Sequence, residues 1–480
     1  MRGLTRVVQL ARSVRGVDGR AHPTVLLVVL CLAKFMSGLD EFVVNVALHP
    51  LGNALGEESL TSLSWVLNGY AIVFAAVLVP AGRLADRYGT KRAFLVGLAL
   101  FSLGSLGCGL STNLWLLVGL RCVQAAGAAA LVPTSLGLVL TALPAERVSR
   151  SVQLWSIAGS LGAAIGPALG GLVVQVSWRW VFIVNVPIGL VAFAATVALA
   201  PGTRARPPAS LPDLAGGGLL MVGVGALSLA LVEGPSWGWG DRRVAVAVSV
   251  AVVALAGCLL RSTRVAVPVV DLALFRRPAF GWANTANLAL WLAFGIQLLG
   301  LVLWLQREPG ASAVRTGLAM VPGPVMVSVT ALGLRRCIAA LPAGAVAGAG
   351  CLLVGGGGVL IGSSLTSHGR YLTEVLPGWL IMGVGVGLAM PTLVATATAG
   401  LLPNEASTGA AVVQTGSQIG SVLGVAALVV VLGSERVIGA TVGDFVRSWW
   451  CAGGFSLVAA LACLPLLRRP VSDQTADVAG

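Results

Sequence analysis

Long apolar stretches, separated by short polar segments, divide this chain of 480 residues into a regular series. Fourteen of them come close to the roughly 20 residues that a helix needs to cross the hydrocarbon core of a bilayer. Because a chain in lipid must satisfy its own backbone groups, such stretches are typical of helices. The pattern predicts an all-α polytopic membrane protein with 14 transmembrane helices, centred near residues 36, 73, 102, 127, 163, 190, 224, 252, 293, 325, 352, 388, 420 and 457.

The composition supports this fold class. Hydrophobic residues make up 57% of the chain and charged residues 10%, with a mean hydropathy of +0.92. A soluble protein carries about 25% charged residues, so there is no room for a sizeable soluble domain. The eight cysteines stand singly, and His22, His49 and His368 lie far apart. We therefore expect no disulfide framework, no metal site and no cofactor.

Basic residues concentrate on one side of the predicted membrane. If the N-terminus is inside, most of the 31 lysines and arginines fall in inner segments, and the positive-inside rule then places both termini in the cytoplasm. Residues 1–23 would form a basic cytoplasmic tail, which either lies on the membrane surface or is disordered, and residues 468–480 a second tail. This bias explains the net charge of +13 without a nucleic-acid partner. The excess of arginine over lysine favours a bacterial source, and hence the bacterial inner membrane.

Two faint internal repeats suggest that the chain has two similar halves. The segment Gly127–Thr134 (GAAALVPT) resembles Gly385–Thr392 (GVGLAMPT), and the surroundings of Ser160 resemble those of Ser421 at a similar offset. We expect a six-span bundle over residues 24–200, two linker spans over 201–265, and a second six-span bundle over 266–467. Parallel repeats of this kind are a transporter architecture, with the binding site between the halves.

The segment Gly82–Arg92 (GRLADRYGTKR) joins the second and third spans on the predicted cytoplasmic side. Gly82 would allow two helices to approach closely, and Asp86 would cap the next helix or pair with an arginine of a neighbouring one. Such a latch could hold the inner side closed; the alternative is an ordinary basic loop. The pattern resembles the loop signature of the major facilitator superfamily. The resemblance implies a gating role for Gly82, Asp86, Arg87, Gly89, Lys91 and Arg92.

A stripe of glycines marks the fifth span. Gly162, Gly166 and Gly170 recur every four residues, which favours close helix packing, and Pro167 removes a backbone donor. Together with Gly171, this segment resembles the antiporter motif of exporters in the superfamily. The resemblance favours export over uptake.

Three further segments resemble the fourteen-span drug:proton antiporters of that superfamily: LDEFVVNVAL from Leu39, WRWVFIVNVPIG from Trp178 and PVVDLALFRRPAF from Pro268. The resemblance covers nearly the whole chain and implies proton-driven export of a small drug- or antibiotic-like compound. Glu41-Phe42 stands where the family pattern usually has threonine after the acid. No lysine followed by serine or threonine comes after the glycine run at Gly355–Gly358, so we expect no ATP site.

The first span carries charges at membrane depth, where each costs at least about 2.5–3.5 kcal/mol. Lys34, Gly38, Glu41 and Asn45 share one helix face, and Asp40 lies about 100° away. In the fourth span Arg121 and Gln124 share a face, at nearly the same depth as Asp40. These side chains should therefore meet inside the bundle.

Two interpretations of these charges remain open. In the first, the ion pairs Lys34–Glu41 and Asp40–Arg121 only fix the helix packing, although a buried pair is a poor stabiliser compared with apolar packing. In the second they form a proton site, since poor solvation raises the pKa of a carboxyl group and a nearby guanidinium opposes that rise. We favour the second, with Asp40 as the obligatory proton carrier and Glu41, balanced by Lys34, as a secondary group.

Other polar residues could line a substrate cavity or simply bond one helix to another. These candidates are Asn45, Gln124, Asn284, Asn287, Gln414 and Gln418. Since the cores of the last six spans hold no acid, an amphipathic, neutral, monocationic or weakly acidic substrate fits better than a strong dication. We expect protons, a small molecule and the lipid bilayer as partners, and a functional monomer. The alternatives are proton-coupled uptake on the same fold, or a membrane enzyme, for which no convergent catalytic cluster is visible.

Overall fold

The structure is a computed structural model. It describes residues 23–57, 59–143, 145–201, 212–266, 268–307, 312–334, 341–366, 370–401, 406–433 and 440–468. Nearly all of the predicted N-terminal tail and of the C-terminal tail therefore lies outside the described residues.

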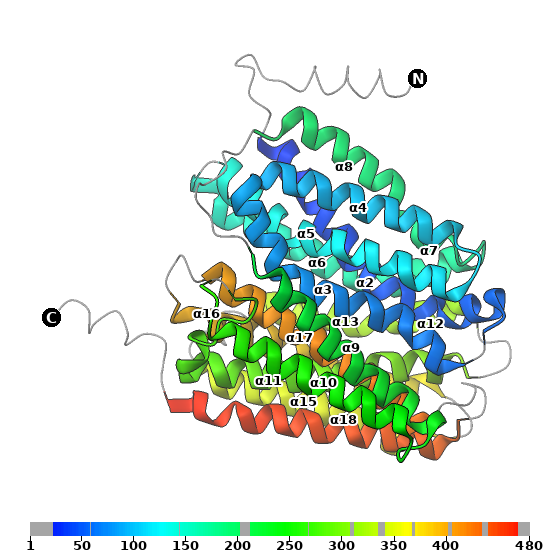
Figure 1. The fold of residues 1–480 in the computed structure, drawn as a ribbon. Helices are drawn as coiled ribbons and strands as arrows, with labels where there is room; N and C mark the ends of the chain where they lie inside the picture. Colours follow the sequence, from blue (N-terminus) through cyan, green and yellow to red (C-terminus); the bar gives the residue numbers. More distant parts are fainter. Residues whose placement is uncertain are drawn as a thin grey trace.

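In the described part of the chain every regular element is a helix, so the predicted fold class is confirmed there (Figure 1). Each predicted centre falls inside one of these helices. They are α2 (Pro23–Leu55), α3 (Leu60–Tyr88), α4 (Thr90–Leu110), α5 (Leu114–Ala142), α6 (Ala145–Val174), α7 (Trp180–Ile183), α8 (Asn185–Leu199), α9 (Leu214–Trp237), α10 (Arg242–Ser262), α11 (Pro278–Leu305), α12 (Ala313–Met320), α13 (Pro322–Gly333), α15 (Ala343–Ser364), α16 (Leu376–Ala399), α17 (Ala406–Leu432) and α18 (Val442–Ala462).

The number of spans differs by one from the fourteen expected. Thirteen helical segments among the described residues are long and apolar enough to cross a membrane. The helix that makes the difference is α2, which has 33 residues and carries Lys34, Asp40 and Glu41. The protein is therefore a multi-pass membrane protein, and the first helix of the described part carries charges inside its apolar span.

Polar caps set several helix ends. Ser59, Asn113 and Asp241 each accept a hydrogen bond from a backbone N–H in the first turn of α3, α5 and α10. Thr441 and Asp444 form a capping box at the start of α18. Because the first N–H groups of a helix have no partner within it, these caps define where each helix begins.

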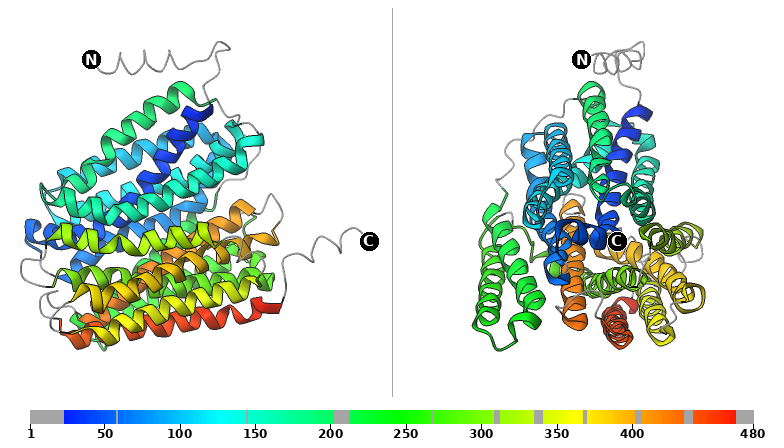
Figure 2. Two further views of the ribbon diagram at one scale, coloured as in Figure 1. Left: turned by 180° about the vertical axis from the view of Figure 1, so that it is seen from behind. Right: turned by 90° about the vertical axis from the view of Figure 1, so that its right-hand side faces the viewer.

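The helices form two packed groups. In the N-terminal group, α2–α8, helix α2 packs on α6 and α4 packs on α5; in the C-terminal group, α11–α18, the same arrangement recurs as α11 on α17 and α15 on α16. Glycines make these contacts close: a Cβ at Gly127 would overlap Phe101 of α4, and one at Gly385 would overlap Gly350 of α15. The α9–α10 pair lies to one side, against α3 and α17 (Figure 2).

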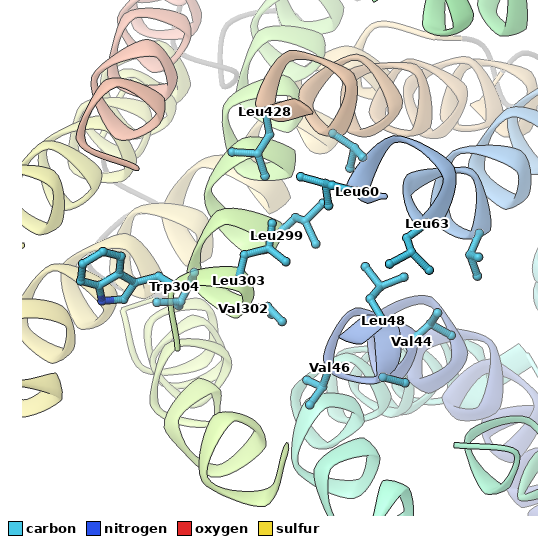
Figure 3. Packing of buried hydrophobic residues seen from close by; sticks show 14 of the residues in the cluster. Val44, Val46, Leu48, Leu60, Leu63, Leu299, Val302, Leu303, Trp304 and Leu428 are labelled. Atoms are coloured by element: carbon cyan, nitrogen blue, oxygen red, sulfur yellow. The ribbon is translucent and has the colours of Figure 1, made fainter. Parts of the chain in front are cut away.

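The two groups touch each other near both ends of the molecule. At the end where α2 finishes and α3 begins, a cluster of leucines and valines from α2, α3, α11 and α17 packs together, as Figure 3 shows. There the Gln306 amide donates to the carbonyl of Val46 at 2.9 Å. Near the opposite end, the Arg83 guanidinium donates to the Thr408 hydroxyl at 2.7 Å. In this conformation the two groups are therefore in contact near both ends.

Candidate functional site

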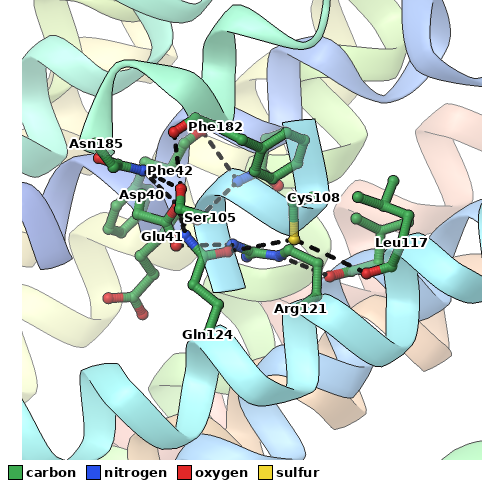
Figure 4. Close-up of polar contacts among 12 residues, drawn as sticks. Asp40, Glu41, Phe42, Ser105, Cys108, Leu117, Arg121, Gln124, Phe182 and Asn185 are labelled. Carbon is green, nitrogen blue, oxygen red and sulfur yellow. Dashed lines mark hydrogen bonds and ion pairs between the residues drawn. The ribbon is translucent and has the colours of Figure 1, made fainter. Parts of the chain in front are cut away.

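The Asp40 carboxylate lies at the centre of a buried polar network (Figure 4). Its Oδ2 accepts from Arg121 Nη1 at 2.7 Å, and its Oδ1 accepts from the amides of Gln124 at 2.8 Å and Asn185 at 3.1 Å. Asp40 is completely buried and Arg121 is 1% exposed. As their depths predict, Asp40 and Arg121 do meet, and both carboxylate oxygens accept hydrogen bonds from side chains.

The Arg121 guanidinium is held from several sides. Beyond Asp40, it donates to Gln124 Oε1 at 2.8 Å and lies 4.0 Å from the ring centre of Tyr70 and 5.7 Å from that of Phe182. Aromatic faces stabilise a cation that has lost its water. One carboxylate, one amide, the backbone carbonyl of Val66 and two rings thus replace the water that the buried guanidinium has lost.

Two members of this network were missed in the sequence. Ser105 of α4 accepts from both Gln124 and Asn185 and donates to the Phe182 carbonyl at 2.7 Å. Asn185 is the first residue of α8 and lies in the segment WRWVFIVNVPIG. A single amide in such an apolar run could have indicated a buried polar contact. Ser105 carries no such signal, since a serine is common in a membrane helix.

Glu41 has a different environment from its neighbour Asp40. It lines a cavity of about 50 Å³ between the two groups, and its Oε1 accepts from the Gln418 amide of α17 at 2.9 Å. Among the described residues we find no ion pair for Glu41. Figure 4 shows its carboxylate turned away from the network around Asp40. The two adjacent acids therefore lie in different surroundings: Asp40 inside the N-terminal group and Glu41 between the two groups.

Polar and aromatic side chains surround this cavity. Asn45, Arg121, Gln418 and Ser421 supply polar surface, and Tyr70, Trp291 and Phe294 supply aromatic surface. Its volume is far below the roughly 300–1,000 Å³ of a small-molecule site. The groups must therefore move apart before a drug-sized compound can enter.

The expected ion pair between Lys34 and Glu41 is wrong for the described structure. The Lys34 ammonium instead lies 5.1 Å from the ring centre of Trp155 on α6, and its chain packs on Gly159. The physical reason is the spacing: seven residues separate the two groups by about 10 Å along the helix axis. Lys34 is therefore not the direct counter-ion of Glu41 in this conformation.

The cavity candidates fall into four sets. Asn45 and Gln418 line the cavity, whereas Gln124 lies behind it in the Asp40 network. Asn287 donates to Val413 O and Ser417 Oγ, which bonds α11 to α17, and Asn284 donates to the carbonyl of Phe280 in its own helix. Gln414 does not line this cavity.

The gating segment is almost entirely helical. Gly82, Asp86 and Arg87 belong to the end of α3, Lys91 and Arg92 begin α4, and Gly89 alone forms the turn with a φ of 98° that favours glycine. Lys91 donates to the carbonyls of Val197 and Ala200 at the end of α8. The turn thus ties α3, α4 and α8 together.

Two expectations for this segment are not met. Asp86 is exposed; it does not cap α4, and no partner for it is found among the described residues. A Cβ at Gly82 would make only ordinary contact, 3.8 Å from Pro133. The reason is that Asp86 points to the surface, and the neighbouring Arg83 makes the contact with the C-terminal group instead.

The glycine stripe of α6 packs closely, as predicted. A Cβ at Gly162 would overlap the carbonyl of Phe35, and those at Gly166 and Gly170 would lie 3.1 Å and 2.8 Å from the carbonyls of Leu39 and Val43. On another face, a Cβ at Gly171 would overlap the Ala313 carbonyl of α12. The motif therefore joins the helix that carries Asp40 and Glu41 to the C-terminal group.

Comparison with solved structures defines the class of fold as that of membrane transporters. The chain aligns with a POT family transporter in complex with 5-aminolevulinic acid (TM-score 0.67, 17% identity, 96% of this chain and 99% of that one). It also aligns with a bacterial homologue of the lysosomal transporter Spinster (TM-score 0.64, 16% identity, 93% and 99%). Residues 30–425 match the family model of the Major Facilitator Superfamily. The chain belongs to this superfamily.

Its relatives include named resistance and export proteins. The methylenomycin A resistance protein of Streptomyces coelicolor is 34% identical over 85% of this chain and 86% of its own length. The cephamycin export protein CmcT of Amycolatopsis lactamdurans is 35% identical over 88% and 89%. The multidrug resistance protein Stp of Mycobacterium tuberculosis is 34% identical over 84% and 74%.

Proposed function

We propose that the protein exports a small amphipathic, drug- or antibiotic-like compound in exchange for protons, by alternating access. The observation that carries this proposal is a cluster of ionisable side chains at membrane depth, Asp40 and Glu41 of α2 with Arg121 of α5, directly beside a cavity between the two helix groups. Charges at membrane depth are expensive and typically mark ion or substrate pathways. The names of the relatives support export of antibiotics and drugs.

In this proposal α2 also crosses the membrane and brings the number of spans from thirteen to fourteen. Its polar face is tolerated because it turns toward the bundle interior. The N-terminal and C-terminal groups act as two six-span bundles that rock about the cavity, with α9 and α10 as linker spans. Their matching internal packing supports this arrangement. The functional unit is a monomer in the bacterial inner membrane, with both termini in the cytoplasm.

The gating roles are also proposals. The turn at Gly89 holds α3 against α4 and α8 on the proposed cytoplasmic side, where the Arg83–Thr408 bond joins the groups. This contact must break when the cavity opens inward. The contacts of Gly171 and Ala313, near the opposite end, must break when the cavity opens outward.

Labelling of single cysteines in a cysteine-free background tests the orientation. Thr112, Ser236 and Thr263 are exposed positions outside the apolar cores of the spans. Cysteines at Thr112 and Ser236 should react with a membrane-impermeant thiol reagent in intact cells, and one at Thr263 should react only after lysis. Reaction of the Thr263 cysteine in intact cells would reverse the proposed topology.

Accumulation in cells tests the direction and the energy source. In a bacterial host without its own efflux pumps, expression should lower the accumulation of at least one compound among methylenomycin A, puromycin, tetracenomycin C and ethidium. A protonophore should abolish the difference, because the proton gradient is the energy source, and depletion of ATP at constant gradient should leave it intact. A rise in accumulation would instead support the alternative, proton-coupled uptake.

A further inference from the structure

We propose that Glu41, rather than Asp40, is the carboxylate at which the proton and the substrate exchange, and that the substrate presents a single cationic nitrogen to it. This inference rests on the proposed function and deepens it. It assigns the exchange to a side chain that departs from the usual family pattern and replaces the sequence-based expectation that Asp40 is the obligatory carrier.

The first argument is access. Asp40 is completely buried, and its two oxygens accept three hydrogen bonds, from one guanidinium and two amides, all within the N-terminal group. Protonation would neutralise Asp40 and leave the Arg121 cation buried without its counter-ion, a costly state. Glu41 is partly exposed and borders the cavity, so a proton, or a substrate once the two groups have moved apart, reaches it without breaking this network.

The second argument is coupling to the conformational change. Gln418 Nε2 donates to Glu41 Oε1 across the boundary between the two groups, from α17 to α2. Any opening of the cavity that separates these helices breaks this bond and leaves the carboxylate without its amide donor. A proton or a substrate cation can then take the place of Gln418. The occupancy of Glu41 is thereby linked to whether the cavity is open or closed.

The third argument concerns the charges that face Glu41. Arg121 and Asp40 neutralise each other at 2.7 Å, and Lys34 lies two helical turns away on the same helix, over Trp155. Tyr70 is the remaining titratable side chain that lines the cavity in the described part of the protein. Glu41 is therefore the carboxylate on the cavity wall that has no direct ion pair among the described residues, and one such carboxylate matches one cation.

The walls of the cavity fit the same substrate class. Trp291 and Phe294 line it from α11 and Tyr70 from α3. Aromatic faces attract a desolvated cation by about 0.5–2 kcal/mol each and offer stacking surface to a flat ring system. A singly charged aromatic compound would meet the carboxylate with its nitrogen and the aromatic walls with its rings.

The exchange balances in charge. Outside, a proton binds to the Glu41 carboxylate and the substrate cation leaves; inside, the carboxylic acid releases its proton and the next cation takes its place. One positive charge moves in each direction, so the exchange of a monocation for one proton is electroneutral. No further reactant is required.

Infrared difference spectroscopy of the purified full-length protein tests this assignment without a ligand. Acidification should produce the C=O stretching band of a protonated carboxyl group in the wild type and in Asp40→Asn. The other carboxylates of the chain contribute to this band in every variant. The component that comes from a poorly solvated carboxyl group should be missing in Glu41→Gln and retained in the matched control Glu233→Gln, which alters a glutamate near the end of α9. If Asp40→Asn destabilises the protein, the double variant Asp40→Asn/Arg121→Met serves in its place. A band that is lost with Asp40 and retained in Glu41→Gln would overturn the proposal.

Binding of ethidium, an aromatic monocation, tests the substrate class. At pH values low enough to protonate Glu41, the affinity of the wild type for ethidium should fall about tenfold for each further unit by which the pH is lowered, because proton and cation compete for one group. In Glu41→Gln the affinity should be low and independent of pH. Absence of ethidium binding to the wild type, or unchanged pH dependence in Glu41→Gln, would contradict the proposal. If these contradicting results are obtained but the protein still exports drugs in exchange for protons, the proposed function stands and only the assignment to Glu41 fails. If the protein does not carry out proton-driven export, the proposed function and the assignment to Glu41 both fail.

Discussion

Replacement of Arg121 by methionine is expected to destabilise the protein by about 3–5 kcal/mol, because it leaves the Asp40 carboxylate buried without a cation. The carboxylate keeps its amide donors Gln124 and Asn185, but these do not balance its charge. We expect a lower thermal unfolding midpoint in detergent and loss of export. The measurement is thermal unfolding of the purified variant beside the wild type.

The double variant Asp40→Asn/Arg121→Met separates the charge effect from simple loss of packing. Asparagine keeps an oxygen that accepts from Gln124, and methionine fills part of the space of the arginine. Removal of both partners of a buried ion pair is often nearly neutral, so most of the lost stability should return. If the double variant is as unstable as the single one, the pair does not act through charge compensation.

Replacement of Gly317 by leucine is expected to abolish export while leaving the protein inserted in the membrane. A Cβ at Gly317 of α12 would overlap the Pro167 carbonyl of α6, so a larger side chain prevents these helices from closing. Overpacking of this kind costs about 1–3 kcal/mol, which is relieved if the two groups stay apart at that end. The transporter would then remain open at the end that we propose to face outward.

Thiol labelling detects this shift. A cysteine at Asn45, which lines the cavity, should react faster with an impermeant reagent from outside in the Gly317→Leu background than in the parent. The matched control is Gly333→Leu, since a Cβ at that position in α13 meets no atom within 4 Å. Equal labelling and export in the two leucine variants would show that the α6–α12 contact does not gate the cavity.

Much of the fold could be predicted because its signal is local. A run of about 20 apolar residues identifies a membrane helix wherever it occurs, and the expected centres all fall in helices. The glycine stripe of α6 was readable for the same reason, since residues four apart share a helix face. Asp40 and Arg121 could be paired from depth alone, because both helices cross the same membrane.

What could not be predicted depends on which side chains meet across helices far apart in the sequence. Nothing in the sequence indicates that Gln418 contacts Glu41, since the two lie on helices from different halves of the chain. The pair expected between Lys34 and Glu41 was wrong because a shared face was taken to mean contact, although the groups lie two turns apart. The contact of Trp155 with Lys34 likewise depends on the tertiary packing of α6 against α2.

The central claim, proton-driven export, is tested most directly in reconstituted vesicles with the cytoplasmic face outward, an acidic interior and the membrane potential clamped at zero. A compound that the expressing cells exclude is added outside, and a trapped dye reports the internal pH. The account predicts that the compound accumulates inside while the internal pH rises. For a monocation exchanged for one proton, accumulation should reach about tenfold per unit of pH difference. Accumulation without proton movement, or without dependence on the pH gradient, would contradict the account.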